Sequence, residues 1–551
     1  MVDAREYHEE TKHSPRSVRE DSFRLDRSNR PRPYKVYEGL PRVPAAEPAS
    51  VETPVLEAVA TAGSDPPPGA VADSARGGSG AGSDAGPGSG PDRDPDVDAL
   101  CYHATGVTKE LERRGQSMRF RAAACTGKLY HVDLYAVTGD CGRFDPGVYH
   151  YDPEGDAFDV LREGDYRGVL AAAAGGHEGV ANAPVTFVAA SEWWRNAWKY
   201  RSRTYRHAFW DSGTILANLL AAAHGAGHRA EVVAGFADDP VADLLGLDPD
   251  EEAPLELVPV GSGDPVPGSA GGAGDHDPGA PDDAGDGAAD PVAVDPIAPE
   301  TIPPSDRIVE YPLVPDAWRQ SRLDRGEVDA LRDRFAVGGP GDGVAVAEDA
   351  GDGEWVELDP VDADTASARP VTATVERRGS LREYSRDPVS ARKVATVFDR
   401  ALGGLPVDCF GPGRVDGILD YYCLVLGVEG VSTGTYQYHP DETALERVGD
   451  ADRETAGRLA LDQSVVGDAA VNVYCLADLD RVVECAGDRG YRLAQLAGGL
   501  ALGRLYLATY AHLSLGGRGF TFYDDLVTDH LAPRGADHTP MTLFAFGSPP
   551  A

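Results

Sequence analysis

The chain of 551 residues has little of the chemistry that marks secreted, metal-binding or membrane proteins. Its seven cysteines are scattered without a C-x-x-C pair or a metal-ligand spacing, which predicts reduced thiols and no zinc site. No run of about eighteen apolar residues is present, so we expect no membrane-spanning helix. The segment MVDAREYHEETKHS has no apolar stretch, so we expect no signal peptide and a cytoplasmic protein.

Positive charge is also scarce, and lysine is much rarer than arginine. Lys and Arg total 51 against 90 Asp and Glu, which gives a net charge of -39. Such a surface does not neutralise phosphates over a broad face, so nucleic acid and anionic membranes are poor partners. The excess of carboxylates suggests a halophilic surface, because high salt screens self-repulsion. Acidic linkers that inflate the total are the alternative explanation.

Two segments rich in Gly, Pro, Ala and Asp divide the chain, and their composition predicts disordered linkers. They separate two blocks that can bury a core. The resulting division is an N-terminal segment 1–44, a linker 45–97, a first folded block 98–261, a linker 262–304, a connector with an acidic stretch 305–372, and a second folded block 373–548.

The two folded blocks are an internal repeat. A shift of 286 positions aligns them without a gap over their most similar stretch. The residues that coincide include Tyr205 with Tyr491, Arg206 with Arg492, Gly213 with Gly499, Leu216 with Leu502, Phe236 with Phe522, and Asp238 with Asp524. So many coincidences in one register indicate that the chain carries one fold twice.

Each block shows the same order of predicted elements: a β-rich run, a hairpin through a Tyr-x-Tyr motif, a strand, a long helix and a final strand. A further helix, with Ser390 as its N-cap, is expected at the start of the second block. The irregular alternation predicts an α+β fold around an antiparallel or mixed sheet. The expected strands are 129–137, 184–190 and 255–261 in the first block and 420–428, 469–477 and 541–547 in the second.

In order and spacing, these segments resemble the nitroreductase superfamily, in particular its SagB/ThcOx-type dehydrogenases. The stretches that carry the resemblance include HEETKHSPRSVRE, LCYHATGVTKE, AACTGKLYHVDLYAV, WKYRSRTYRH, VEYPLVPDAWRQSRL and ERRGSLREYSRDPVS. The resemblance implies two tandem nitroreductase-like domains that form an intramolecular pseudo-dimer with FMN at the interface. It also implies a flavin-dependent oxidoreductase that acts on a small or peptidic substrate. The reaction is then oxidation of peptide azolines, as in the branch, or reduction of nitro or quinone compounds, as in the superfamily.

A cluster of arginines in the second block matches the phosphate-binding motif of this family. Arg377, Arg378, Ser380 and Arg382 supply the guanidinium donors and the hydroxyl that a flavin phosphate needs. A solvated charged turn is the alternative interpretation. Arg206 recurs at the repeat register and is expected either to bind phosphate or to pair with a nearby aspartate.

A loop of the first block matches the family's flavin-ring loop, with Cys125, Thr126 and Gly127 in place of the usual Ser-x-Gly. Gly516, Gly517 and Arg518 occupy the position of the family's Gly-rich turn. Each block therefore retains a different half of the site. These matches imply one composite FMN site and a second, reciprocal site that is no longer functional.

Lys199 and Tyr200 match the Lys-Tyr pair that SagB-type dehydrogenases use for proton abstraction, and we expect them to be catalytic. A surface lysine beside a packing tyrosine is the alternative. The rival function is a degenerate, non-catalytic flavin-fold protein that binds a partner in a biosynthetic complex. Loss of the Pro-Ser signature from the flavin-ring loop favours this rival, whereas the arginine motif and the Lys-Tyr pair argue against it.

Overall fold

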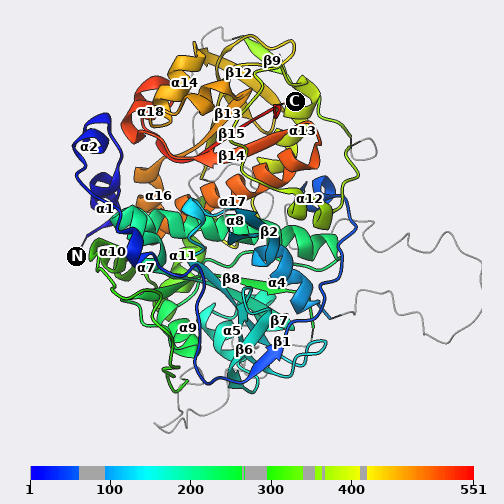
Figure 1. The fold of residues 1–551 in the computed structure, drawn as a ribbon, viewed down its shortest axis with the longest axis vertical. Coiled ribbons are helices and arrows are strands. Elements are labelled where there is room, and N and C mark those ends of the chain that lie inside the picture. Colours follow the sequence, from blue (N-terminus) through cyan, green and yellow to red (C-terminus); the bar gives the residue numbers. More distant parts are fainter. Residues whose placement is uncertain are drawn as a thin grey trace, which may run out of the picture.

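The computed structural model describes residues 2–60, 94–113, 115–263, 266, 294–338, 354–362, 366–409 and 418–550. Two long helices, α8 (Thr204–Gly225) and α17 (Arg489–Ala511), lie side by side across the middle. An antiparallel sheet of the first half lies on one side of this helix pair, and a sheet of the second half lies on the other (Figure 1). The expected α+β class is confirmed.

The sheet of the first half has the strand order β1-β6-β5-β4-β7-β8. Its strands are β1 (Arg42–Pro44), β4 (Val132–Thr138), β5 (Gly147–Asp152), β6 (Ala157–Glu163), β7 (Val185–Glu192) and β8 (Glu252–Val260). The helices of this half are α4 (Val97–Thr105), α5 (Arg167–Ala173), α6 (Glu178–Asn182), α7 (Trp193–Tyr200) and α9 (Asp238–Leu245), and a hairpin pairs β2 (Val107–Arg113) with β3 (Gln116–Arg121).

The sheet of the second half has the order β14-β15-β13-β10-β11-β12-β9. Its strands are β9 (Trp355–Glu357), β10 (Asp420–Val425), β11 (Gly434–His439), β12 (Ala444–Gly449), β13 (Val471–Ala477), β14 (Gly516–Phe520) and β15 (Thr539–Gly547). Its helices are α12 (Val371–Arg377), α13 (Ala391–Ala401), α14 (Arg453–Leu459), α15 (Ser464–Asp468), α16 (Leu479–Ala486) and α18 (Asp524–Leu531).

The remaining helices belong to the connecting segments. They are α1 (Ala4–Thr11), α2 (Pro15–Glu20), α3 (Val55–Ala60), α10 (Leu313–Ser321) and α11 (Arg325–Gly338). Among the described residues no helix is both long and apolar enough to cross a membrane.

The order of elements recurs between the halves. The series β4, β5, β6, α5, α6, β7, α7, α8, α9, β8 is followed later in the chain by β10, β11, β12, α14, α15, β13, α16, α17, β14, α18, β15, where β14 has no named counterpart in the first half. A strand from an upstream segment extends each sheet, β1 beside β6 and β9 beside β12. The helix predicted to begin after Ser390 is present as α13, although the Ser390 side chain makes no capping hydrogen bond.

The two central helices come close to each other at a pair of glycines that coincide in the repeat. A Cβ atom on Gly213 would lie 2.4 Å from the carbonyl carbon of Gly499, and one on Gly499 would lie 2.3 Å from the carbonyl oxygen of Phe209. Side chains at these positions would force the helices apart. The glycines therefore permit the contact on which the two halves assemble.

Reciprocal buried ion pairs link the halves around this crossing. Arg206 Nη1 lies 2.6 Å from Asp524 Oδ1, and Arg492 Nη1 lies 2.6 Å from Asp238 Oδ1. Burial opposes ionisation of Asp524, but the charges of Arg203 and Arg206 outweigh it and hold the pKa of this carboxyl well below its usual range. Each half thus supplies the carboxylate for the arginines of the other, as in an isologous interface.

The first predicted linker is partly structured. Within residues 45–97, α3 is buried and contacts both α8 and α17, and α4 begins at Val97. The prediction of disorder is wrong for these residues, because the apolar sequence Val55-Leu56 inserts into the interface. Residues 61–93 and most of the predicted linker 262–304 lie outside the described residues.

Candidate functional site

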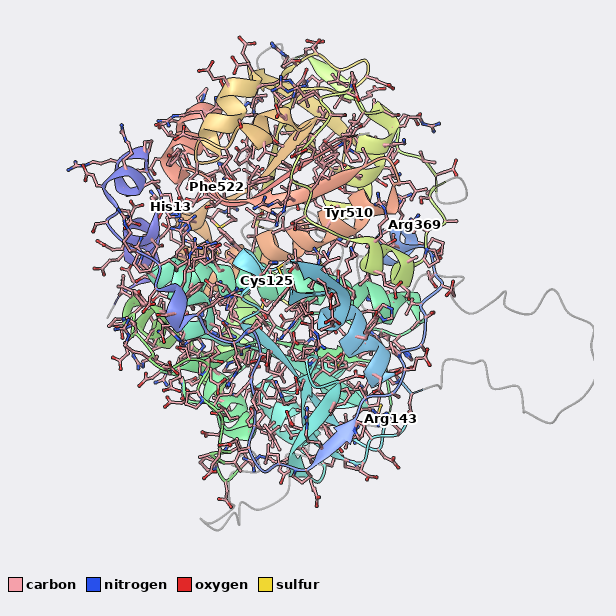
Figure 2. All side chains as sticks on the ribbon, in the orientation of Figure 1. His13, Cys125, Arg143, Arg369, Tyr510 and Phe522 are labelled. Atoms are coloured by element: carbon pink, nitrogen blue, oxygen red, sulfur yellow. The ribbon has the colours of Figure 1, made fainter. Side chains whose placement is uncertain are left out.

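A cavity of about 360 Å³ lies between the two halves. The first half contributes the loop before β4, the end of α7 and one face of α8, while the second half contributes Ser380 and parts of α17, β14 and β15. Figure 2 shows Cys125 of that loop near the boundary of the halves. The cavity therefore unites the loop predicted in one block with residues predicted in the other.

The carboxylate of Asp211 on α8 holds the flavin-ring loop in place. It accepts hydrogen bonds from the backbone N of Thr126 at 2.9 Å and from its Oγ1 at 2.7 Å. The Sγ of Cys125 donates to the same carboxylate at 3.0 Å. His131 Nε2 lies 3.0 Å from Asp211 on the buried side. The loop is thus fixed by a charge-assisted hydrogen-bond network that resists rearrangement.

Cys125 is a poor nucleophile in this setting. Burial, followed by the neighbouring charge of Asp211, raises the pKa of its thiol well above the usual value. The thiol therefore stays protonated and serves as a hydrogen-bond donor to Asp211.

Gly127 and Tyr200 meet at the wall of the cavity. Gly127 has a φ of +65°, and a Cβ atom there would lie 2.8 Å from the Tyr200 hydroxyl oxygen. Both the backbone conformation and the close approach require glycine at this position. The loop consequently presents backbone, not a side chain, beside the tyrosine hydroxyl.

Lys199 and Tyr200 both line the cavity, and their protonation equilibria move in opposite directions. Burial, together with the charges of Arg518 and Arg30, lowers the pKa of the Lys199 ammonium. Burial, together with Asp211 and Cys125, raises the pKa of the Tyr200 hydroxyl. The lysine is thus shifted toward its neutral form, whereas the tyrosine remains a proton donor.

The tryptophans that precede this pair belong to the core. The indole nitrogens of Trp193, Trp194 and Trp198 donate to Pro249, Ser305 and Asp26, respectively, and none of the three lines the cavity. Arg195, also on α7, is fully buried and pairs with Asp133. These contacts fix α7 so that its last two residues reach the cavity.

The structure separates the four residues of the arginine motif. Only Ser380 lines the cavity, whereas Arg382 is exposed. Burial lowers the pKa of Lys128, and the charge of Arg382 lowers it further. Arg377 donates to the carbonyls of Tyr510 and Leu513. A direct role in phosphate binding stays a prediction for Ser380 and Arg382.

Arg378 is buried and attaches the second half to the first. Its Nε donates to the carbonyl of Ala122 at 2.6 Å, and its Nη2 donates to the carbonyls of Arg121 and Ala123. These residues lead directly into the flavin-ring loop. Arg378 therefore positions that loop from the opposite half, a contact that its sequence motif did not indicate.

Three other predicted residues do not reach the cavity. Arg206 is fully buried in its ion pair with Asp524, so the structural alternative holds and the expectation that it contacts a cofactor is corrected. Gly516 and Gly517 pack against Leu381 and Phe544. Arg518, the next residue of β14, does line the cavity.

Several residues of the cavity were not expected from the sequence. His207, Trp210, Asp211 and Thr214 follow one another on a single face of α8. Their helical spacing was a usable signal, but the same spacing is typical of core packing. His13 reaches the cavity from the N-terminal segment, where its backbone N donates to Asp524, and no sequence pattern indicated this contact.

At the equivalent position of the other half, the cavity-lining face is apolar. Positions 207, 210, 211 and 214 correspond to Leu493, Leu496, Ala497 and Leu500, all of which are buried. The counterpart of Arg518 is Val232, whose backbone pairs with Val407, and Asp408 accepts from the backbone N of Ala234. Residues 407 and 408 therefore cover the segment of the first half that corresponds to β14, which forms one wall of the cavity in the second half.

No group of three or more His, Cys, Asp or Glu side chains in the described part of the chain could hold a metal ion.

Comparison with known proteins supports the fold. Residues 101–262 match the model of the Nitroreductase family, so this part of the chain is similar to that family. The "Putative nitroreductase MJ1384" of Methanocaldococcus jannaschii is 28% identical over 162 residues, which cover 29% of this chain and 77% of that protein. A solved structure described as a "putative nitroreductase" from Anabaena variabilis has 20% identity, a TM-score of 0.69 and full coverage of both chains. A second solved structure, also described as a "putative nitroreductase", comes from Ralstonia eutropha and is 20% identical, with a TM-score of 0.30. The match covers 36% of this chain and 92% of the Ralstonia chain.

Proposed function

We propose that the protein is an FMN-dependent oxidoreductase with one composite site between two nitroreductase-like halves. The observation that carries this proposal is the cavity that joins Cys125, Thr126 and Gly127 of the first half to Ser380 and Arg518 of the second. The match of residues 101–262 to the Nitroreductase family agrees with it.

The residues of the cavity fit a flavin mononucleotide. Its volume lies within the range of about 300–1,000 Å³ that is typical of small-molecule sites. Trp210, Leu502 and Tyr506 offer apolar surface for a ring system, and Ser380 offers a donor for a phosphate, with Arg382 two residues further along the chain. Bound there, the flavin would supply hydride or electron-pair chemistry.

The chain's own residues would then handle protons. Lys199 is the better base of the pair, since burial and the charge of Arg518 lower its pKa and shift it toward the neutral form. Tyr200, whose raised pKa keeps its hydroxyl protonated, would donate a hydrogen bond. This division of roles suits removal of a proton from a substrate carbon or nitrogen, as oxidation of an azoline requires.

We further propose that the reciprocal site is lost. Its helix face carries leucine and alanine where the cavity has histidine, tryptophan, aspartate and threonine, and residues 406–408 pair with the backbone of Val232, the counterpart of Arg518. The recurring order of elements and the reciprocal ion pairs support descent from a tandem pair that forms an intramolecular pseudo-dimer.

The SagB/ThcOx branch, with azoline oxidation, is our preferred assignment, and reduction of nitro or quinone compounds is the alternative within the superfamily. We place the protein in the cytoplasm. The net charge of -39 supports an organism adapted to high salt. One observation favours a non-catalytic role as a binding protein. The guanidinium of Arg378, which was expected to bind phosphate, donates its hydrogen bonds to backbone carbonyls instead.

The test is an absorbance spectrum of protein purified in high salt, followed by heat release and quantification of any flavin. About one FMN per chain, together with loss of binding in Asp211→Ala, would support the proposal. Two FMN per chain would refute the single site. A colourless protein that cannot be reloaded would refute FMN dependence and favour the binding role.

A further inference from the structure

The carboxylate of Asp211 lines the cavity and has a histidine behind it. The backbone N of Thr126 donates to this carboxylate at 2.9 Å, and the Cys125 thiol donates at 3.0 Å, which is the pattern expected of an ionised group. In the described part of the chain no lysine or arginine forms an ion pair with Asp211. A flavin in the cavity would therefore lie beside a negative charge.

The histidine behind the carboxylate is His131, which is fully buried between Asp211 and Ser191. Its Nε2 lies 3.0 Å from Asp211 Oδ2, and its Nδ1 lies 2.9 Å from Ser191 Oγ. Nε2 carries a proton, because an ionised carboxylate only accepts hydrogen bonds. The serine hydroxyl can donate to a bare Nδ1 or accept from a protonated one. The ring can therefore gain a proton without losing either hydrogen bond.

The two histidines that line the cavity are less suited to gain a proton. His207 Nδ1 lies 3.0 Å from the amide oxygen of Asn196, and burial lowers the pKa of this ring well below the usual value. Burial also lowers the pKa of His13 to about 3. Both rings therefore stay neutral, whereas His131 has a carboxylate partner that favours its charged form.

Reduction of a bound flavin would change the charge that Asp211 faces. A hydride from an organic substrate carries two electrons and one proton, so it adds one negative charge to the flavin that accepts it. Two negative charges repel each other strongly at a site of low dielectric. A proton on a group that contacts one of them relieves this repulsion.

We propose that His131 takes up a proton at Nδ1 when a flavin in the cavity is reduced, and so offsets the charge of Asp211. This inference rests on the proposed function and adds a second proton to its reaction. The two electrons and the first proton come from the substrate, and the second proton comes from water. His131 does not line the cavity, so it acts on the flavin only through Asp211.

Other titratable or charged groups of the cavity bear on where this proton goes. Burial, followed by the charge of Asp211, raises the pKa of both Cys125 and Tyr200, so these groups hold their protons before reduction. The guanidinium of Arg518 keeps its charge in both states. Lys199 is the rival acceptor, because burial and Arg518 shift it toward its neutral form.

The number of protons taken up per two electrons tests the inference. The midpoint potential of the full-length, FMN-loaded protein is measured at several pH values around pH 8, where an ordinary histidine is neutral, and its slope against pH gives this number. His131→Gln keeps an amide donor for Asp211 but cannot gain a proton. We expect two protons in the wild type and one in His131→Gln, so the slope should fall about twofold.

His150→Gln is the matched control, since His150 is also a buried histidine that contacts carboxylates. Asp133 and Asp159 outweigh burial and raise the pKa of this ring, which does not line the cavity. We expect His150→Gln to take up two protons. Lys199→Met removes the rival acceptor and should also leave the second proton in place.

Nitrogen NMR of FMN-loaded protein labelled in its histidines gives a second readout, which does not depend on a variant that folds. On reduction near pH 8, one imidazole should change from singly to doubly protonated. Where His131→Gln folds, its spectrum should lack this signal. A wild-type spectrum without such a change, or with the His131 ring doubly protonated before reduction, would overturn the inference.

The remaining outcomes separate this inference from the function on which it rests. Equal proton uptake by FMN-loaded wild type and His131→Gln would exclude the proton site and leave the flavin enzyme standing. Loss of the second proton in Lys199→Met, with none in His131→Gln, would assign that proton to Lys199 and contradict the inference. A protein that cannot be loaded with FMN would refute the oxidoreductase and this inference together.

Discussion

The two central helices occupy equivalent places in their halves but differ in what they present. On α8, one face carries His207, Trp210, Asp211 and Thr214 into the cavity, whereas the same face of α17 carries Leu493, Leu496, Ala497 and Leu500. The residues that join the halves, by contrast, are paired in both directions. The ion pairs that join the halves are thus symmetrical, whereas polar side chains occupy this helix face in one half only.

The largest expected effect comes from removing the buried ion pairs that join the two halves. Asp238→Asn and Asp524→Asn each leave two buried arginines without a counter-charge, so each is expected to lower the free energy of unfolding by roughly 3–5 kcal/mol. Urea denaturation in high salt measures both. The matched control is Asp525→Asn, an exposed partner of Lys12, which should cost less than about 1 kcal/mol. A large loss in one variant and none in the other would contradict the equivalence of the two ion pairs.

A second change replaces one polar residue on the cavity face of α8 with its apolar counterpart from α17. Asp211→Ala installs the residue found at the equivalent position 497 and releases the loop at Thr126. Loss of this buried network should weaken FMN binding at least about tenfold and destabilise the fold by roughly 2 kcal/mol. Fluorescence titration with FMN measures the affinity, and Asp239→Ala, at an exposed ion pair with Arg322, is the control. Unchanged FMN affinity would show that the loop does not contact the flavin.

A third change tests whether the crossing is as symmetrical as the geometry indicates. Gly213→Ala and Gly499→Ala each introduce a Cβ atom within 2.4 Å of the opposing backbone. Each should destabilise the protein by about 1–3 kcal/mol, since packed helices must separate. Thermal denaturation compares them with Gly403→Ala, whose Cβ would meet its nearest atom at 3.5 Å. A loss no greater than that of the control would mean that the helices separate freely.

A fourth test concerns the pH dependence of stability and one buried carboxyl. Burial raises the pKa of Glu256 to about 8, and the hydrogen bond from Ser212 and the charges of Arg489 and Arg492 oppose it only in part. The second half has Thr542 at the equivalent place. Because the folded state retains a proton that the unfolded state releases above pH 4.5, this group's contribution to stability falls as pH rises toward 8.

Glu256→Gln should remove this dependence. The wild-type free energy of unfolding should decline by up to about 1.4 kcal/mol per pH unit between pH 5.5 and 8 relative to the variant. Denaturation at several pH values measures the difference between the two proteins. Parallel curves for both would show that Glu256 is not protonated in the folded state.

Much of the fold could be predicted from the sequence. Strand and helix periodicity located β4, β7, β8, β10, β13, β15 and α13, because each buries one pattern of apolar residues. The register of the repeat also identified Arg206, Arg492, Asp238 and Asp524 as equivalent residues, which the structure joins in ion pairs. Local sequence patterns are enough to predict a residue's role when that role depends on the helix or strand to which the residue belongs.

The candidate site was less accessible to such reasoning. Asp211 lies in a helix whose polar residues have no motif, and its partners in the loop at 125–126 are distant in sequence. Arg378 matched a phosphate motif, yet its donors meet carbonyls of the other half. The helix α3 lies in a segment whose overall composition suggests disorder. Each of these depends on tertiary contacts, which override local preference.

The covalent connection between the halves has a consequence for how the site responds to dilution. In a dimer of separate chains, a cavity formed by both subunits disappears when the protein is diluted below its dissociation constant. Here Asp211 and Ser380, on opposite walls, belong to one polypeptide, so their encounter is unimolecular and independent of concentration. The cavity should therefore persist at nanomolar protein, and a substitution can alter one wall without its copy appearing in the other.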